Sequence, residues 1–193
     1  MAEPKIYSTS EWGAKPAKAT AFARDAAEGI AVHNMEYPNR APLTGDEELR
    51  AAFDASRKCQ SDHFDRGWRD TGQHFTISRG GVIMEGRHGS LAGAKDGQVV
   101  QGSHVGTNHH NRRWFGVELE GYYRDAPSIS DEQWASLVEL CAWLAFWGDL
   151  DTRNIKGHKE LHETDCPGLL MDSRGDELRA AVKSRKEEIA GGA

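Results

Sequence analysis

A chain of 193 residues is the size of one ordinary domain, since single domains usually contain about 50 to 250 residues. Hydrophobic residues make up 38% and charged residues 28% of it, a balance that is typical of a folded protein and excludes a disordered chain. The 30 acidic against 24 basic residues give a net charge of -6, and no run of Lys or Arg could follow a phosphate backbone. We therefore expect no nucleic-acid partner.

The ends and the apolar stretches of the chain predict no membrane association. The N-terminus, Met1-Ala2-Glu3-Pro4-Lys5, is not followed by the apolar segment of a secretory signal or an anchor. The densest apolar stretch, Trp134 to Trp147, is interrupted by Ser136 and Glu139 and is shorter than the roughly 20 residues that a bilayer requires. We expect one monomeric domain over residues 1–193, made in the cytoplasm without a signal peptide, with a frayed tail at about residues 190–193.

The first part of the chain predicts a strand, a loop and a helix. Gly29-Ile30-Ala31-Val32 is typical of a short buried strand, and His33 stands at its exit, where side chains commonly enter a cleft. The segment from Asn34 to Thr44 contains two prolines and predicts a loop. From Asp46 to about His63, apolar residues recur at helical spacing behind an acidic first turn, which predicts a helix.

The middle of the chain predicts a hairpin, a long loop and a strand. Phe75-Thr76-Ile77 and Val82-Ile83-Met84 flank the turn Arg79-Gly80-Gly81, which indicates two strands of a hairpin. From Gly86 to Arg113 the sequence is rich in Gly, Asn and His without periodicity, so we expect a long loop of the kind that is more often functional than idle. Trp114 to Tyr122 predicts another strand.

Two more helices are predicted in the last third. Ser130-Asp131-Glu132-Gln133 matches a capping box, in which the Ser130 hydroxyl and the Gln133 side chain satisfy backbone N–H groups reciprocally, and the apolar helix begins there. A last helix is expected from about Gly175 to Ile189. Strands mixed with about three helices predict a mixed α/β fold, with a central mixed sheet and the helices packed against it.

The cysteines indicate metal chemistry rather than disulfides. Three cysteines are an odd number in a chain without a predicted export signal, and Cys59 and Cys141 lie in helical stretches, where a buried and inert thiol is the usual outcome. Cys166 differs, because it follows His158 by eight residues in a segment that Pro167-Gly168 closes. Catalytic zinc normally takes three protein ligands and leaves a fourth position open to water, and this loop could bring two of them to one metal.

A zincin is the alternative metal site for the same segment. His158 and His162 are four residues apart and would share a helical face with a glutamate between them. The zincin motif, however, requires the glutamate directly after the first histidine, and this chain has Lys159 there and Glu160 one position later. The spacing therefore disfavours a zincin.

Six short motifs follow one another over nearly the whole chain. They are Ser10-Glu11-Trp12-Gly13-Ala14, Ile30-Ala31-Val32-His33, Trp68-Arg69-Asp70-Thr71-Gly72-Gln73-His74-Phe75, Gly102-Ser103-His104-Val105, Phe115-Gly116-Val117-Glu118-Leu119-Glu120-Gly121, and Gly157-His158 with Asp165-Cys166-Pro167-Gly168. In this order they resemble the type 2 N-acetylmuramoyl-L-alanine amidase family, which includes phage amidase lysozymes and peptidoglycan recognition proteins. The resemblance implies a single recognition-protein-like domain that cuts the amide between N-acetylmuramic acid and L-alanine in bacterial peptidoglycan.

The resemblance also implies a cofactor and a set of site residues. It implies that His33, His158 and Cys166 bind zinc, that Glu118 assists the attacking water and that Thr164 faces the reacting carbonyl. A zinc-activated water makes hydroxide available near neutral pH, and a carboxylate beside it can move the proton to the departing amine.

The strand that carries Glu118 also carries a second carboxylate. Alternation along the strand sends Val117 and Leu119 to the core face and Glu118 and Glu120 to the other face. Either glutamate can therefore face a cleft or be an ordinary solvated strand residue.

Four further residues concern the substrate and the reaction. Gln73 stands where many active members have a tyrosine that is thought to stabilise the oxyanion; its amide NH2 can still donate, and loss of such a donor typically costs a factor of about 100 to 1000. His104, Asn108 and Arg112 are predicted to line the glycopeptide groove, although a solvated loop has the same composition.

Three functional hypotheses follow: a phage or bacterial lysin that attacks intact cell wall, a cytosolic amidase that recycles muropeptides, and a non-catalytic peptidoglycan-binding module. Cys166 favours an enzyme, because a pure binder has no need of a third soft ligand. The start Trp12-Gly13-Ala14, the long loop and the cysteine ligand favour the lysin.

Overall fold

A six-stranded mixed sheet forms the centre of the structure, a computed structural model that describes residues 3–192. The strands lie in the order β1-β5-β4-β7-β3-β8, and all neighbouring pairs are parallel except β4 with β5. Their bounds are β1 Ile6–Tyr7, β3 Gly29–Asn34, β4 Phe75–Ile77, β5 Ile83–Glu85, β7 Trp114–Leu119 and β8 Ile155–Gly157. The predicted mixed α/β fold with a central mixed sheet is confirmed.

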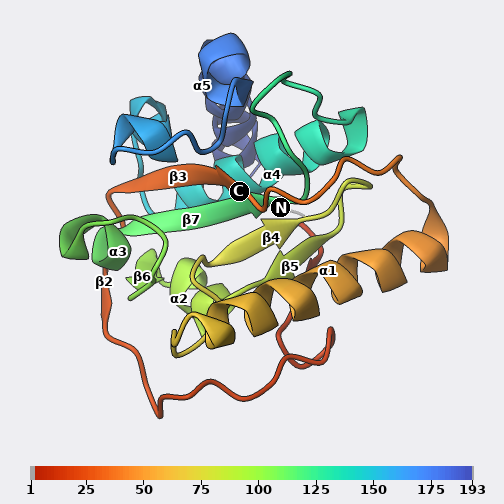
Figure 1. The fold of residues 1–193 in the computed structure, drawn as a ribbon. Coiled ribbons are helices and arrows are strands. Elements are labelled where there is room, and N and C mark those ends of the chain that lie inside the picture. The colour runs from red at the N-terminus through yellow and green to blue at the C-terminus, as the bar shows by residue number, and fades with distance from the viewer. Residues whose placement is uncertain (1–2, 193) are drawn as a thin grey trace.

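Three long helices cover the two faces of this sheet (Figure 1). Helix α1 (Gly45–Asp65) lies on one face, and α4 (Asp131–Trp147) and α5 (Leu170–Gly191) lie together on the other. All three are predicted from the sequence, but α5 begins earlier than expected and continues to Gly191. Helix α5 therefore includes residues 190 and 191 of the tail expected at about residues 190–193, and fraying of this tail stays a prediction. Ala193, and the residues Met1 and Ala2 at the expected leaderless N-terminus, lie outside the described residues.

The segment from Gly86 to Arg113 is not the loop that its composition predicts. It contains α2 (Ser90–Lys95), β6 (Gln98–Val100) and α3 (Asn108–Arg113), and β6 pairs antiparallel with β2 (Arg24–Ala26) in a second, two-stranded sheet. Elements of three to six residues are too short to show a hydrophobic period, and contacts with the rest of the domain stabilise them. Residues 3–192 consequently contain five α-helices rather than three.

The start of α4 is predicted correctly, but its capping box is only half right. Ser130 Oγ accepts a hydrogen bond from Gln133 N at 3.3 Å. The Gln133 side chain turns inward instead and donates to the carbonyl oxygens of Ile77 and Glu120 at 2.9 and 3.0 Å. These carbonyls lie just where β4 and β7 end, and a buried carbonyl requires a hydrogen-bond partner. Strand β7 correspondingly ends at Leu119 rather than at the predicted Tyr122.

The two faces of the sheet differ in chemistry. Facing α4 and α5, side chains such as Phe75 and Val117 are fully buried in the main apolar core. On the opposite face, His33 of β3, Glu118 of β7 and Thr76 of β4 are neighbours in register. Residues paired across parallel strands point to the same side, so these polar groups gather beneath α1.

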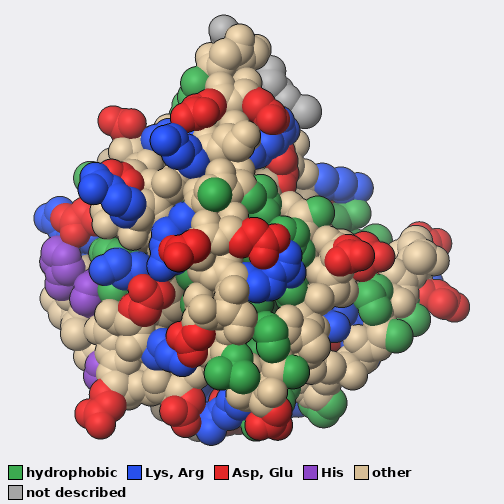
Figure 2. Space-filling view, turned by 90° about the horizontal axis from the view of Figure 1, so that it is seen from above, with side chains coloured by type: hydrophobic (Ala, Val, Ile, Leu, Met, Phe, Trp, Pro, Cys, Tyr) green, Lys and Arg blue, Asp and Glu red, His purple; other side chains and the backbone are tan. Residues whose placement is uncertain are grey.

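Opposite charges are interspersed on the surface seen from above. Figure 2 shows Lys and Arg side chains beside Asp and Glu side chains rather than in large patches of one sign. Ion pairs on exposed helices, such as Arg174 with Glu177 at 2.6 Å, follow the same pattern. Within residues 3–192, no helix has both the length and the apolar character needed to cross a bilayer.

Candidate metal centre

Three potential metal ligands meet near the carboxyl ends of the central strands. His33 lies on β3, His158 directly follows β8, and Cys166 lies in the loop before α5. Their ligand atoms lie within 4.8 Å of one another, and Cys166 Sγ is 3.7 Å from His33 Nδ1. A nitrogen and a sulfur bound to one tetrahedral zinc are about 3.5 Å apart, given the usual bond lengths. The structure thus brings together the three residues predicted as ligands, at a spacing that suits zinc.

A chain of hydrogen bonds sets the tautomer of His33. The Trp114 carbonyl oxygen can only accept, so His104 Nε2, 3.1 Å away, donates to it. His104 Nδ1 is then the acceptor for the Nε2–H of His33, at 2.9 Å. Neutral His33 therefore keeps its lone pair on Nδ1, the atom that faces Cys166. A hydrogen bond on the ring nitrogen that does not face the metal is typical of metal-binding histidines. Burial, together with the nearby His158, lowers the pKa of His33 well below its usual value.

The other two ligands also suit a metal. Nε2 of His158 is buried without a hydrogen-bond partner among residues 3–192, and burial lowers the pKa of His158 to about 4. Burial raises the pKa of the Cys166 thiol to about 12, and a metal would replace that proton because it binds the thiolate. Two imidazoles and one thiolate, with a fourth position open, form a donor set that fits catalytic zinc.

The loop that carries Cys166 is held against the chain between β7 and α4. Leu169 N donates to the Tyr123 carbonyl at 2.8 Å, and Lys159 N donates to the Cys166 carbonyl at 2.7 Å. Gly168 has a φ of +72°, and a Cβ at this position would lie 2.3 Å from the Tyr123 oxygen. Only glycine permits this approach, so the Pro-Gly turn fixes where the thiol lies.

The ligands open into a cavity of about 280 Å³, and Glu118 lines it beside His33, its neighbour across β3 and β7. Among residues 3–192, no hydrogen bond engages the Glu118 carboxylate. Desolvation raises the pKa of Glu118 to about 7, against the opposing effect of Arg66. A carboxyl group with this pKa can exchange a proton near neutral pH, as a general base requires.

Thr164 and Gln73, the other two residues predicted to be catalytic, line the same cavity. Thr164 Oγ1 accepts a hydrogen bond from Cys166 N at 3.3 Å, which leaves its hydroxyl proton to be donated. Gln73 is buried, and its Nε2 donates to Cys59 Sγ at 3.2 Å. The second hydrogen of this NH2 group remains for a ligand.

The residues predicted to line a substrate groove separate into two groups. His104 lines the cavity, but both of its ring nitrogens form hydrogen bonds within the protein. One of these hydrogen bonds orients His33. Asn108 and Arg112 lie on α3, outside the residues that line the cavity, and Arg112 Nε pairs with Asp25 of β2 at 2.7 Å. Substrate contact by these residues remains a prediction.

Tyr37, Arg66 and Arg124 also line the cavity, and the sequence does not single them out. The Tyr37 hydroxyl donates to Asp62 at 2.8 Å, and Arg124 pairs with Glu36 at 2.6 Å. A basic residue shortly after the strand of Glu118 could have indicated Arg124. Nothing in the local pattern separates Tyr37 or Arg66 from ordinary loop residues, because only the packing of α1 brings them to the cavity.

Glu120 is buried and ion-paired rather than solvated. Arg40 Nε lies 2.7 Å from its carboxylate, and Arg40 Nη1 lies 2.7 Å from Glu48 of α1. Arg79 N donates to the same Glu120 carboxylate at 2.9 Å. Glu120 therefore ties the end of β7 to the loop after β3 and to α1, which is a structural role.

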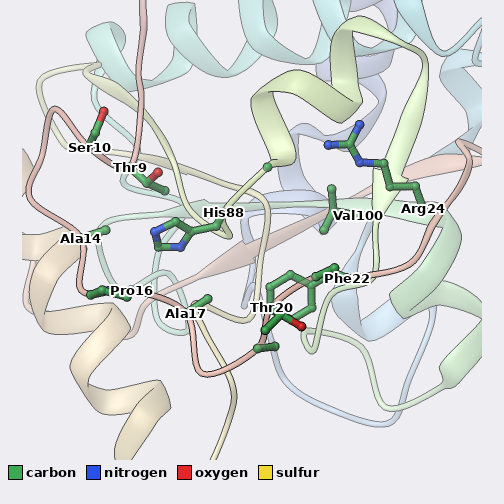
Figure 3. Close-up of a pocket in the computed structure, with 13 residues that line it drawn as sticks. Thr9, Ser10, Ala14, Pro16, Ala17, Thr20, Phe22, Arg24, His88 and Val100 are labelled. Carbon is green, nitrogen blue, oxygen red and sulfur yellow. The ribbon is translucent and has the colours of Figure 1, made fainter.

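A larger hollow, of about 720 Å³, lies between the N-terminal segment and the turn before α2 (Figure 3). Small side chains line most of it, and the larger side chains at its wall are those of Phe22, Arg24 and His88. His88 alone among its lining residues could bind a metal, and its Nδ1 already contacts Asp70 at 2.9 Å. The convergence of ligands, and not size, therefore marks the smaller cavity as the candidate site.

A cluster of potential metal ligands thus lies beside a carboxyl of raised pKa, in one cavity near the ends of the central strands. A family model described as N-acetylmuramoyl-L-alanine amidase matches residues 23–169, and the chain belongs to this family. An N-acetylmuramoyl-L-alanine amidase of Sus scrofa is 33% identical over 174 residues, which are 86% of this chain and 26% of the porcine protein. The chain thus spans about a quarter of that relative's length.

Solved structures share the fold. The N-acetylmuramoyl-L-alanine amidase LysC from Clostridium intestinale URNW is 24% identical, with a TM-score of 0.68 over 93% of this chain and 98% of that one. A mutant of Drosophila PGRP-LB in complex with tracheal cytotoxin is 26% identical, with a TM-score of 0.65 over 84% and 88% of the two chains. The predicted family and the recognition-protein-like fold are confirmed.

Proposed function

We propose that this protein is a zinc-dependent N-acetylmuramoyl-L-alanine amidase, which hydrolyses the amide between N-acetylmuramic acid and L-alanine in peptidoglycan. The observation that carries the proposal is the cluster of His33, His158 and Cys166 beside Glu118 in one cavity. Membership of the family and the identity with the porcine amidase support the same reaction.

The residues of the cavity divide the reaction between them. Zinc held by the two histidines and Cys166 would supply a Lewis acid that polarises the carbonyl and lowers the pKa of water. Glu118 accepts the proton of the attacking water, since its carboxylate is unengaged and its pKa is about 7. It then gives this proton to the amine nitrogen of L-alanine as the C–N bond breaks. The Thr164 hydroxyl and the Gln73 amide donate to the carbonyl oxygen, where negative charge develops.

We further propose that the substrate is intact cell wall, as for a phage or bacterial lysin. Two features support this assignment: the Trp12-Gly13-Ala14 motif and the cysteine ligand, both of which resemble motifs of the amidase family. The tracheal cytotoxin complex of the PGRP-LB mutant supports a muropeptide as the ligand. The protein acts on this substrate as a monomer, because one chain supplies the whole proposed site.

Digestion of purified sacculi and of soluble muropeptides by the zinc-loaded protein, followed by mass spectrometry, tests these proposals. We expect free stem peptides that begin with L-alanine and intact glycan strands. New reducing sugar ends would contradict the amidase and indicate a glycosidase, which requires two flanking carboxylates. Binding to sacculi without products would indicate a binding module, and cleavage confined to soluble muropeptides would indicate a recycling enzyme.

A further inference from the structure

A second cluster of potential metal ligands lies in the same cavity. Cys59 and His63 stand one turn apart on α1, and Glu118 lies opposite them on β7. Their ligand atoms lie within 4.8 Å of one another, as those of the first cluster do. Cys59 Sγ is 3.7 Å from His63 Nδ1, the same separation as between the sulfur and nitrogen of the first cluster. We propose that Cys59, His63 and Glu118 form a second, weaker zinc site.

The three side chains suit zinc by type and by charge. Thiolate, imidazole and carboxylate are all ligands that zinc takes in proteins. One thiolate and one carboxylate together neutralise a divalent ion, so a filled second site adds no net charge beside the first metal. Without a metal, burial holds the pKa of the Cys59 thiol well above its usual value, and the Glu118 carboxylate has no hydrogen-bond partner among the described residues.

The hydrogen bonds of the cluster explain why this site is the weaker one. Gly72 N donates to His63 Nδ1 at 3.1 Å, so that nitrogen is unprotonated, as a ligand must be, but a metal bound there displaces this bond. Gln73 Nε2 donates to Cys59 Sγ at 3.2 Å, and this contact must also adjust. In the first cluster, Nε2 of His158 has no such bond to lose. The first site therefore fills before the second.

Sharing Glu118 makes the second site inhibitory. This consequence, unlike the site itself, rests on the proposed amidase function. A carboxylate that binds a metal cannot take a proton from water, and a general base contributes about 100- to 10,000-fold to the rate. Full occupancy of the second site should therefore lower turnover by at least about 100-fold.

Equilibrium dialysis against increasing zinc, with metal analysis, tests the site independently of activity. We expect the parent to bind about two zinc ions, the second with lower affinity, because each cluster offers three ligands. Cys59→Ala and Glu118→Gln should each retain only the first ion, and Cys166→Ala should retain the Cys59 site. Cys141→Ala is the matched control, since this buried thiol of α4 belongs to neither cluster, and it should still bind both ions.

Cobalt in place of zinc identifies the thiol that binds. The Cys166→Ala variant should show a thiolate-to-metal absorption band, and Cys59→Ala/Cys166→Ala should lose it. Cys59→Ser, which keeps the size of the side chain, serves if Cys59→Ala folds poorly. A parent that binds only one zinc ion at millimolar metal, or a Cys59 variant that still binds two, would overturn the second site.

Activity is compared as the ratio of the rates at high and at equimolar zinc in each variant. This ratio should lie far below one in the parent and in Cys141→Ala, and close to one in Cys59→Ala. Two bound ions without any hydrolysis would reject the amidase and leave the second site standing. Hydrolysis by a parent that binds only one ion would reject the second site and leave the amidase standing.

Discussion

The carboxylate of Glu118 should matter for the reaction and little for the catalytic metal. Glu118→Gln keeps the size of the side chain and removes its basicity, so turnover on peptidoglycan should fall by about 100- to 10,000-fold. Zinc held by His33, His158 and Cys166 should remain, because Glu118 is not one of these ligands. Turnover and metal content at equimolar zinc check the two halves of this expectation.

Glu36→Gln is the matched control for that experiment. Glu36 lines the same cavity, but its carboxylate is exposed and paired with Arg124, so its loss should cost far less activity. Glu120→Gln would be a poor control, because Glu120 is buried in ion pairs and its loss would destabilise the fold. A Glu118→Gln protein as active as the parent would place the base on another residue.

The same carboxyl group predicts a pH dependence of stability in the chelated protein. The pKa of Glu118 is about 7 in the fold and near the ordinary 4.5 in the unfolded chain. As pH rises between these values, the unfolded chain releases the proton first. The free energy of unfolding therefore decreases by up to about 3 kcal/mol. Glu118→Gln lacks this loss. Its free energy of unfolding by urea, relative to the parent, should increase from pH 4.5 to pH 8, and a constant difference would contradict the raised pKa.

At the scale of elements, Arg40 links the loop after His33 to α1 and to the end of β7. Its guanidinium lies between the buried carboxylates of Glu48 and Glu120. Arg40→Ala should lower the free energy of unfolding by about 3 to 5 kcal/mol, because two buried charges lose their partner. Arg185 also binds two carboxylates, at the surface, and Arg185→Ala should cost about 1 kcal/mol or less. Equal losses in urea denaturation would show that burial of the Arg40 pairs has no effect.

The sequence predicts the elements that carry a repeating pattern, an apolar run or a strong turn signal, as Arg79-Gly80-Gly81 does between β4 and β5. Helices α1 and α4 and strand β3 show a period or an apolar run long enough to recognise. Strands β6 and β8 contain three residues each, and their hydrogen-bond partners come from distant parts of the chain, so no local pattern predicts them.

The same difference applies to the candidate site. The three proposed zinc ligands could be named from the sequence because they stand in motifs that resemble those of the amidase family. Helical periodicity predicts that Cys59 is buried, and it is, but periodicity cannot say which residues a buried thiol contacts. Its neighbour Gln73 lies in the segment just before β4, and its neighbour Glu118 lies on β7. Only the packing of α1 on the sheet brings Cys59 to these two residues.

For the whole molecule, the bound metal should act as a crosslink. The three proposed ligands come from β3, from the residue after β8 and from the loop before α5, so zinc joins segments that are distant in sequence. A ligand at about 1000 times its dissociation constant stabilises a fold by about 4 kcal/mol. Chelation of the protein loaded with one zinc should therefore lower Tm by roughly 8 to 16 °C. Scanning calorimetry should show no such change in Cys59→Ala/Cys166→Ser, which lacks the thiol of each cluster, and an equal change there would mean that the metal binds elsewhere.

The pairing of His33 with Glu118 across β3 and β7 has an evolutionary consequence. Adjacent strands lie about 4.8 Å apart because backbone hydrogen bonds hold them there, whatever side chains they carry. The distance from the proposed ligand to the proposed base is therefore inherited from the peptide backbone. The residues packed against the sheet can be substituted in evolution, provided that they fill the same volume, without a change in this distance. Selection then has to preserve a handful of side chains at the strand ends rather than a whole interior.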